Sequence, residues 1–96
     1  MILEPAVPAR RVPLEKPASK VQVERMKKQL RENMARNLLR FRTELGLSQR
    51  QLSERADVSQ TYISQIEAKA SRNFGLELIA ALAVALGKSA IDLISD

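Results

Sequence analysis

Apolar residues recur along the first half of the chain at helical spacing. They lie three, four or seven residues apart, at Val23, Met26, Leu30, Met34, Leu38 and Leu45. This spacing places them on one face of a helix. Ser19 and Gln22 form a capping-box pattern directly before this stripe, and Gly46 can end a helix in the left-handed conformation. The pattern predicts a helix over about 20–44, with Asn33 as a candidate break.

Four shorter helices are predicted in the second half. Ser48 and Ser59 stand at N-cap positions and indicate helices over about 49–56 and 60–68, joined by a tight turn at 57–59. Their inward faces carry Leu52, Ala56, Ile63 and Ile66. A strongly apolar helix over about 76–86 stops at Gly87, Ser89 caps a last helix that ends near residue 94, and 69–74 is irregular. With no strand pattern and no repeat, the predicted fold class is all-α.

The N-terminal residues follow a different pattern. All four prolines lie within the first 17 residues, where they prevent helix and favour extended chain. We therefore expect a flexible, basic arm over 1–18, a helical extension over 19–33, and a compact helical domain over 34–96. At 96 residues the chain can form one small domain of modest stability.

The composition excludes several classes of function. The chain has neither cysteine nor histidine, so we expect no disulfide, no metal site, no cofactor and no catalytic triad. The sequence shows no pair of carboxylates that would indicate an active site. We therefore expect that the protein is not an enzyme, and that it has no catalytic residue and no small-molecule substrate. The longest apolar run, 78–86, is too short to span a bilayer, and no signal peptide is evident. We expect a cytoplasmic protein without membrane contact.

Positive charge is concentrated in the first half. Residues 1–45 contain eleven Lys or Arg and five acids, a net charge of +6, whereas residues 46–96 contain five and six, a net charge of −1. This asymmetry favours a polyanionic partner, although a solvated basic surface is the plainer interpretation. Five cations of the first predicted helix would contribute long-range attraction that falls as salt rises: Lys27, Lys28, Arg31, Arg36 and Arg40.

The predicted helix at 60–68 exposes a row of uncharged polar side chains. With Ile63 and Ile66 directed inward, the outward residues are Gln60, Thr61, Ser64 and Gln65. Their side chains both donate and accept hydrogen bonds, which suits the base edges of a DNA major groove, whereas a phosphate-binding surface favours Lys or Arg. Two helices joined by a tight turn can place one helix in that groove. Solvated surface is the alternative interpretation of Gln60 and Gln65.

The segment GLSQRQLSERADVSQTYISQIE resembles the helix-turn-helix of the phage repressor and Cro-like proteins, the Xre family. LELIAALAVALGKSAIDLI resembles the fourth and fifth helices of that family, so the likeness covers roughly 34–94. It implies a five-helix lambda-repressor-like DNA-binding domain over 34–96, here with an extended first helix. Asp57 stands where the family usually has a turn glycine, Ser53 where it has alanine, and the 67–76 loop is about one residue longer.

The resemblance also implies roles for individual residues. The positions of Gln60, Thr61 and Gln65 contact bases in the family, and we add Ser64 from the outward row. Phosphate contacts are implied for Gln49 and Ser59, and expected for Tyr62, Arg72 and Asn73, although the longer loop weakens the transfer to Arg72 and Asn73. Tyr62 can equally rest on its neighbours. Arg42 and Glu67 occupy positions that pair across helices in the family, so we assign them a structural role.

Two further surfaces carry alternative interpretations. Arg10 and Arg11 could enter a minor groove, and a free tail is the other interpretation. Residues of the fourth and fifth helices that are often polar in the family are apolar here: Leu78, Ala81, Val84 and Ile91. They predict a two-fold homodimer contact, with core packing against the extended first helix as the competing account.

These observations predict a sequence-specific regulator that binds double-stranded DNA, a dimeric repressor of an operon that includes its own gene. An antitoxin or a protein-interaction adaptor built on the same fold is the alternative, with a toxin or another regulator as the protein partner.

Overall fold

The computed structural model describes residues 17–71 and 74–96. These residues form five helices and no strand: α1 (Lys20–Glu44), α2 (Gln49–Ala56), α3 (Gln60–Glu67), α4 (Leu76–Leu86) and α5 (Ala90–Ile94). The all-α prediction and the five helices are confirmed. Arg10 and Arg11, like Arg72 and Asn73, lie outside the described residues.

Residues at the helix ends explain where each helix begins and stops. Ser19, Ser48 and Ser89 accept a hydrogen bond from the third helical N–H in a capping box, and Ser59 caps α3 through its hydroxyl oxygen. Gly46 and Gly87 take positive φ angles of 71° and 69°, which stop α1 and α4. Asp57 takes the same left-handed conformation at the end of α2, with φ 56°.

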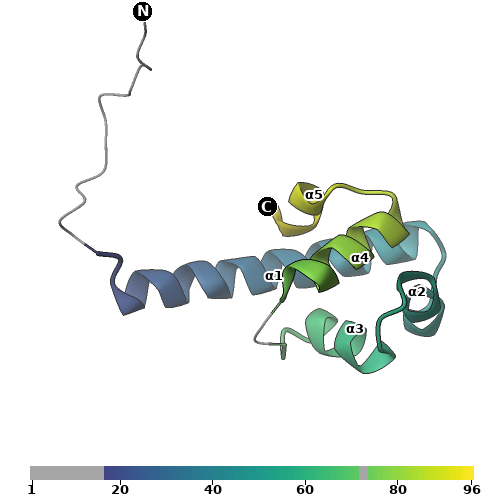
Figure 1. Ribbon diagram of the computed structural model, residues 1–96, viewed down its shortest axis with the longest axis horizontal. Helices are drawn as coiled ribbons and strands as arrows, with labels where there is room; N and C mark the ends of the chain where they lie inside the picture. The colour runs from purple at the N-terminus through teal and green to yellow at the C-terminus, as the bar shows by residue number, and fades with distance from the viewer. Residues whose placement is uncertain (1–16, 72–73) are drawn as a thin grey trace, which may run out of the picture.

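The short helices pack around the C-terminal half of α1 (Figure 1). In that view α3 and α2 lie on one side of α1, and α5 lies on the other side near the C-terminus. A core of buried apolar side chains joins all five helices, with its fully buried members at Met34, Leu38, Leu52, Ile63, Ile66, Leu82 and Leu93. This core fixes the position of α3, whose other face remains open to solvent.

Helix α1 is continuous through residue 33, so the candidate break at Asn33 is absent. Asn33 is buried, and its amide nitrogen donates to the Ile94 carbonyl (2.9 Å) and to the Asp96 carboxylate (3.1 Å). Because this side chain bonds to the C-terminal segment, it does not compete for the backbone of its own helix.

The apolar stripe of α1 is buried over only part of its length. Met34 and Leu38 lie in the core, whereas Val23, Met26 and Leu45 are exposed. Spacing along a helix predicts which residues share a face, but it does not show whether another segment covers that face. The first turns of α1 extend past the packed helices (Figure 1).

Candidate nucleic-acid interface

Two isoleucines anchor one face of helix α3 in the core, and the opposite face is open to solvent. Ile63 and Ile66 are fully buried, and the residues predicted to contact bases are all exposed: Gln60, Thr61, Ser64 and Gln65. Among the described residues, none of these four side chains makes a hydrogen bond to a protein partner. They are therefore available to an external partner along the whole of this short helix.

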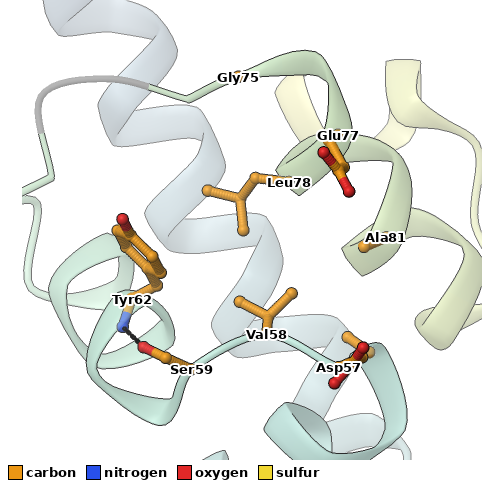
Figure 2. Close-up of a pocket in the computed structure, with 9 residues that line it drawn as sticks. Asp57, Val58, Ser59, Tyr62, Gly75, Glu77, Leu78 and Ala81 are labelled. Atoms are coloured by element: carbon orange, nitrogen blue, oxygen red, sulfur yellow. Dashed lines mark hydrogen bonds between the residues drawn. The ribbon is translucent and has the colours of Figure 1, made fainter.

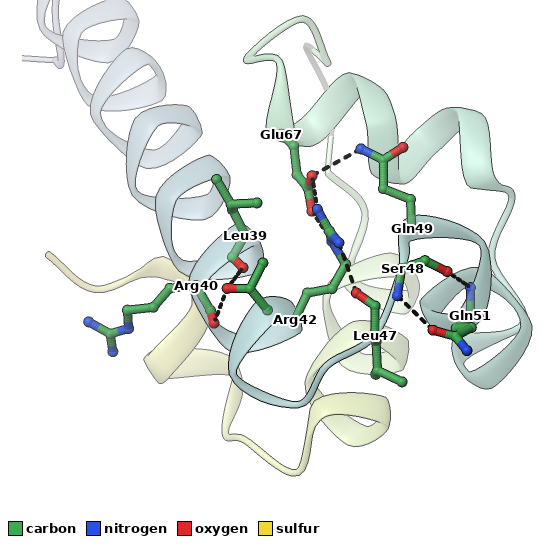
Figure 3. A network of polar contacts seen from close by, with 9 residues as sticks. Leu39, Arg40, Arg42, Leu47, Ser48, Gln49, Gln51 and Glu67 are labelled. Carbon is green, nitrogen blue, oxygen red and sulfur yellow. Dashed lines mark hydrogen bonds and ion pairs between the residues drawn. The ribbon is translucent and has the colours of Figure 1, made fainter.

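An ion pair fixes the C-terminal end of α3. The Arg42 guanidinium makes a two-pronged contact with the Glu67 carboxylate, with N–O distances of 2.7 and 2.8 Å, and its third nitrogen donates to the Leu47 carbonyl (2.8 Å). Both side chains are largely buried, at 12% and 8% exposure. The contact links α1, the start of α2 and the end of α3 (Figure 3).

Gln49 belongs to the same cluster. Its amide nitrogen donates to Glu67 Oε1 at 3.0 Å, so one donor of the residue expected to contact phosphate is already used within the protein (Figure 3). Its amide oxygen accepts no hydrogen bond from the part of the chain that the structure describes, and α2 begins at this residue. An additional phosphate contact through the open N-terminus of α2 stays a prediction.

The electrostatics of the cluster follow from this geometry. Burial alone would raise the pKa of Glu67, but the hydrogen bonds from Arg42 and Gln49, with the positive charge of Arg42, lower the pKa below its usual value of 4.5. The hydrogen bond to Glu67 raises the pKa of Arg42. The pair is therefore ionised at neutral pH and holds its two-pronged geometry there.

Ser59 and Tyr62 lie together at the start of α3. Ser59 Oγ accepts from the Tyr62 backbone N–H at 3.1 Å, and its own hydroxyl hydrogen remains free to donate. The half-exposed Tyr62 ring lines a pocket of about 480 Å³ between the α2–α3 turn and α4, beside Leu78 (Figure 2). Asp57 and Glu77 add carboxylates to this pocket. About half of Tyr62 is accessible, so a phosphate contact through this side chain stays a prediction.

The residues predicted to form a dimer face do not share one environment. Leu78 and Ala81 are partly buried against the core and line the Tyr62 pocket, whereas Val84 and Ile91 are exposed. Two apolar residues that the sequence analysis did not single out accompany Val84 on the outside of α4, at Leu76 and Ala80. Their spacing of four residues was the signal that could have identified them.

The comparisons with known proteins agree with this arrangement. A family model described as helix-turn-helix matches residues 38–93, which include all of α2, α3 and α4. The chain belongs to the Xre family of Cro/C1-type helix-turn-helix proteins. It is a DNA-binding transcription regulator of that family, and double-stranded DNA is its partner.

Solved structures support the same assignment. The chain is similar to the crystal structure of the hypothetical transcription factor NHTF from Neisseria, with 35% identity and a TM-score of 0.66, over 72% of this chain and 78% of that one. A search of the curated proteins returned no significant match. Within the described part of this Xre-family chain, no helix is long and apolar enough to cross a membrane.

Proposed function

We propose that this Xre-family protein is a dimeric repressor of transcription that reads a specific operator, including one at its own gene, by inserting α3 into the major groove. The observation that carries the proposal is the row of free donors and acceptors at Gln60, Thr61, Ser64 and Gln65 on a helix whose position is fixed by buried isoleucines. Side chains of this type can match the donor and acceptor pattern of a base pair.

Phosphate contacts would set the register of α3 on the duplex. We assign them to the N-terminal ends of α2 and α3, through Gln49, Ser59 and Tyr62, and to Arg72 and Asn73, which lie outside the described residues. Free N–H groups and the helix dipole favour a phosphate oxygen at such ends. Arg10 and Arg11 are proposed as a minor-groove arm.

The test replaces the two glutamines separately. Gln60→Ala and Gln65→Ala should each weaken binding to the site that the unmodified protein selects, by about 1–3 kcal/mol for every two-pronged hydrogen bond to a base that the substitution removes. Each variant should also relax the preference at one base pair. Thr43→Ala, a control at an exposed position of α1 whose hydroxyl donates only to carbonyls of its own helix, should leave both affinity and preference unchanged. Unchanged affinity and preference in both α3 variants would show that bases are read elsewhere.

A protein partner is the second candidate. The exposed apolar side chains of Val84 and Ile91 favour a protein contact of some kind. If the protein binds DNA without sequence preference, an antitoxin or adaptor role that uses this surface takes the place of the repressor. Homodimer formation accounts for the same surface within the leading proposal.

A further inference from the structure

The first three turns of α1 form an extension that the rest of the described chain does not cover. Val21, Val23 and Met26 are exposed there, and Asn33 is the first residue of α1 with a hydrogen bond to the described C-terminal segment. Thirteen residues, 20–32, precede that point and span about 20 Å as a helix. A helix of this length without a packing partner is marginal in water.

The extension cannot reach the apolar surface of its own subunit. Helix α1 is unbroken across residue 33, so its first turns point away from α4 (Figure 1). Val23 and Met26 continue the stripe that Met34 and Leu38 bury in the core. The apolar face of the extension is therefore left uncovered by the described residues of its own subunit.

A second uncovered apolar surface lies on α4. Leu76, Ala80 and Val84 stand four residues apart on its outer side, and Leu76 and Val84 are 88% and 80% exposed. We name these three residues the α4 stripe. Val84 also borders a depression of about 380 Å³ between α4 and α2 that is lined mainly by alanines. Such a depression can receive an apolar side chain from a partner.

The extension is basic, whereas the α4 stripe is nearly neutral. Residues 20–32 contain five Lys or Arg and two acids, a net charge of +3, whereas Arg55 and Glu77, which line the depression beside Val84, carry charges that cancel. Pairing the extension with another extension brings like charges together, which disfavours that arrangement. Pairing the extension with the α4 stripe avoids this repulsion and covers both apolar surfaces.

We propose that two copies of the chain exchange their extensions, each placing Val23 and Met26 on the α4 stripe of the other. This rests on the dimer of the proposed function and identifies its contact surface. A two-fold axis makes the contact twice, so two helical segments of about 20 Å contribute to one interface. Because the contact is made twice, the total buried area of the dimer comes closer to the roughly 1,600 Å² that a stable interface buries.

Cysteine cross-linking tests the exchange directly, because the chain has no cysteine of its own. Subunits with Val23→Cys or Met26→Cys are mixed with subunits that carry Leu76→Cys, Ala80→Cys or Val84→Cys, and disulfide-linked dimers are identified by mass. We expect mixed dimers in at least one of the six mixtures. Arg25→Cys, on the opposite side of the extension, should give none with the same partners.

Other cross-linking results would overturn the proposal. Links formed only between two α4 variants would indicate that the α4 stripes face each other across the axis. The absence of any link, together with a monomer in sedimentation equilibrium at tens of micromolar, would show that neither surface binds a second copy.

A second measurement compares Met26→Ala with Val21→Ala, an exposed apolar residue on the side of the extension that carries Arg25. Met26→Ala should raise the dissociation constant of the dimer at least about tenfold, because the side chain leaves both symmetry-related contacts, and Val21→Ala should not change it. An unchanged constant for Met26→Ala would contradict the exchange. Since α3 is intact in this variant, the half-site that it selects from DNA should be that of the unmodified protein. If the unmodified protein selects no site, the readout proposal fails while the cross-linking result stands by itself.

Discussion

The orientation of α3 depends, at the scale of single residues, on the ion pair between Arg42 and Glu67. A carboxylate and a guanidinium in contact and largely buried fix geometry more than they add stability, because both must be removed from water. Removing one partner, however, leaves the other charge buried and unpaired. The helix that carries the proposed base contacts ends at this pair.

We predict that Glu67→Ala lowers the free energy of unfolding by about 3 kcal/mol, since Arg42 then loses its partner. The double variant Arg42→Met, Glu67→Leu should be less destabilised than Glu67→Ala, because it leaves no unpaired charge. Urea unfolding of the single and double variants measures both effects. Equal losses in the two proteins would mean that packing around the pair, and not charge, sets its contribution.

The same pair predicts acid sensitivity. Because the folded state lowers the pKa of Glu67, the pair stabilises the protein fully above the usual pKa of 4.5, and this stabilisation is lost as pH falls through the lower folded value. The hydrogen bond from the Ser89 backbone lowers the pKa of Asp92 too, and acts in the same direction. Thermal unfolding between pH 7 and pH 2.5 should show a steeper acid loss in the unmodified protein than in Glu67→Gln.

Asp57 carries backbone strain at the turn between α2 and α3. Its φ of 56° lies in the left-handed region, which glycine adopts without steric cost. We predict that Asp57→Gly raises the free energy of unfolding by about 0.5–1 kcal/mol, and that Asp57→Ala, which keeps the Cβ and loses the tolerance of Asp, lowers it. If glycine destabilises the turn in urea unfolding, the Asp57 side chain contributes contacts that outweigh the strain.

At the scale of helices, sequence periodicity and capping residues were sufficient to predict the elements. Each serine predicted as an N-cap occupies that position, and Gly46 and Gly87 stop their helices as glycines do. These signals are local, since the residues involved lie within a few positions of one another. Asp57 stands where the family usually has a turn glycine, and its left-handed conformation is local in the same sense.

Contacts between helices were less accessible from the sequence. Asn33 and Asn37, four residues apart on α1, are both buried and bond to the chain around the end of α5, over a separation of more than fifty residues. Nothing local indicates such partners. Likewise, the sequence grouped Leu78 and Val84 on one face, whereas the packing of α4 on the core covers the first and exposes the second.

Asn37 gives the clearest prediction at this scale. Its amide nitrogen donates to the Leu93 and Ser95 carbonyls, at 2.9 and 2.7 Å, and ties α5 to α1. Asn37→Ala should lower the free energy of unfolding by about 2 kcal/mol, because two carbonyls lose a donor at a buried site. Hydrogen exchange should show faster opening of α5 in this variant. Protection of α5 equal to that in the unmodified protein would assign its stability to Leu93 and to the hydrogen bond from Asn33.

At the scale of the molecule, the sequence indicated a basic first half and predicted a DNA-binding regulator. Membership of the Xre family agrees with the prediction of a regulator. The candidate base contacts could be named because they are the outward residues of one short helix. The uncovered extension of α1 and the α4 stripe could not be recognised as two separate surfaces until the fold showed what covers each of them. Composition gives the charge of the chain, but only the packed structure shows which residues are buried.

The central claim is that α3 reads DNA sequence as part of a dimer. The most direct measurement is a selection of this protein against a pool of random duplex DNA at near-physiological salt. The account predicts enrichment of a two-fold symmetric motif, with half-sites about one helical turn, or roughly 34 Å, apart. Binding that fades with salt and enriches no sequence would contradict it, because attraction to phosphates would then be the whole of the interaction.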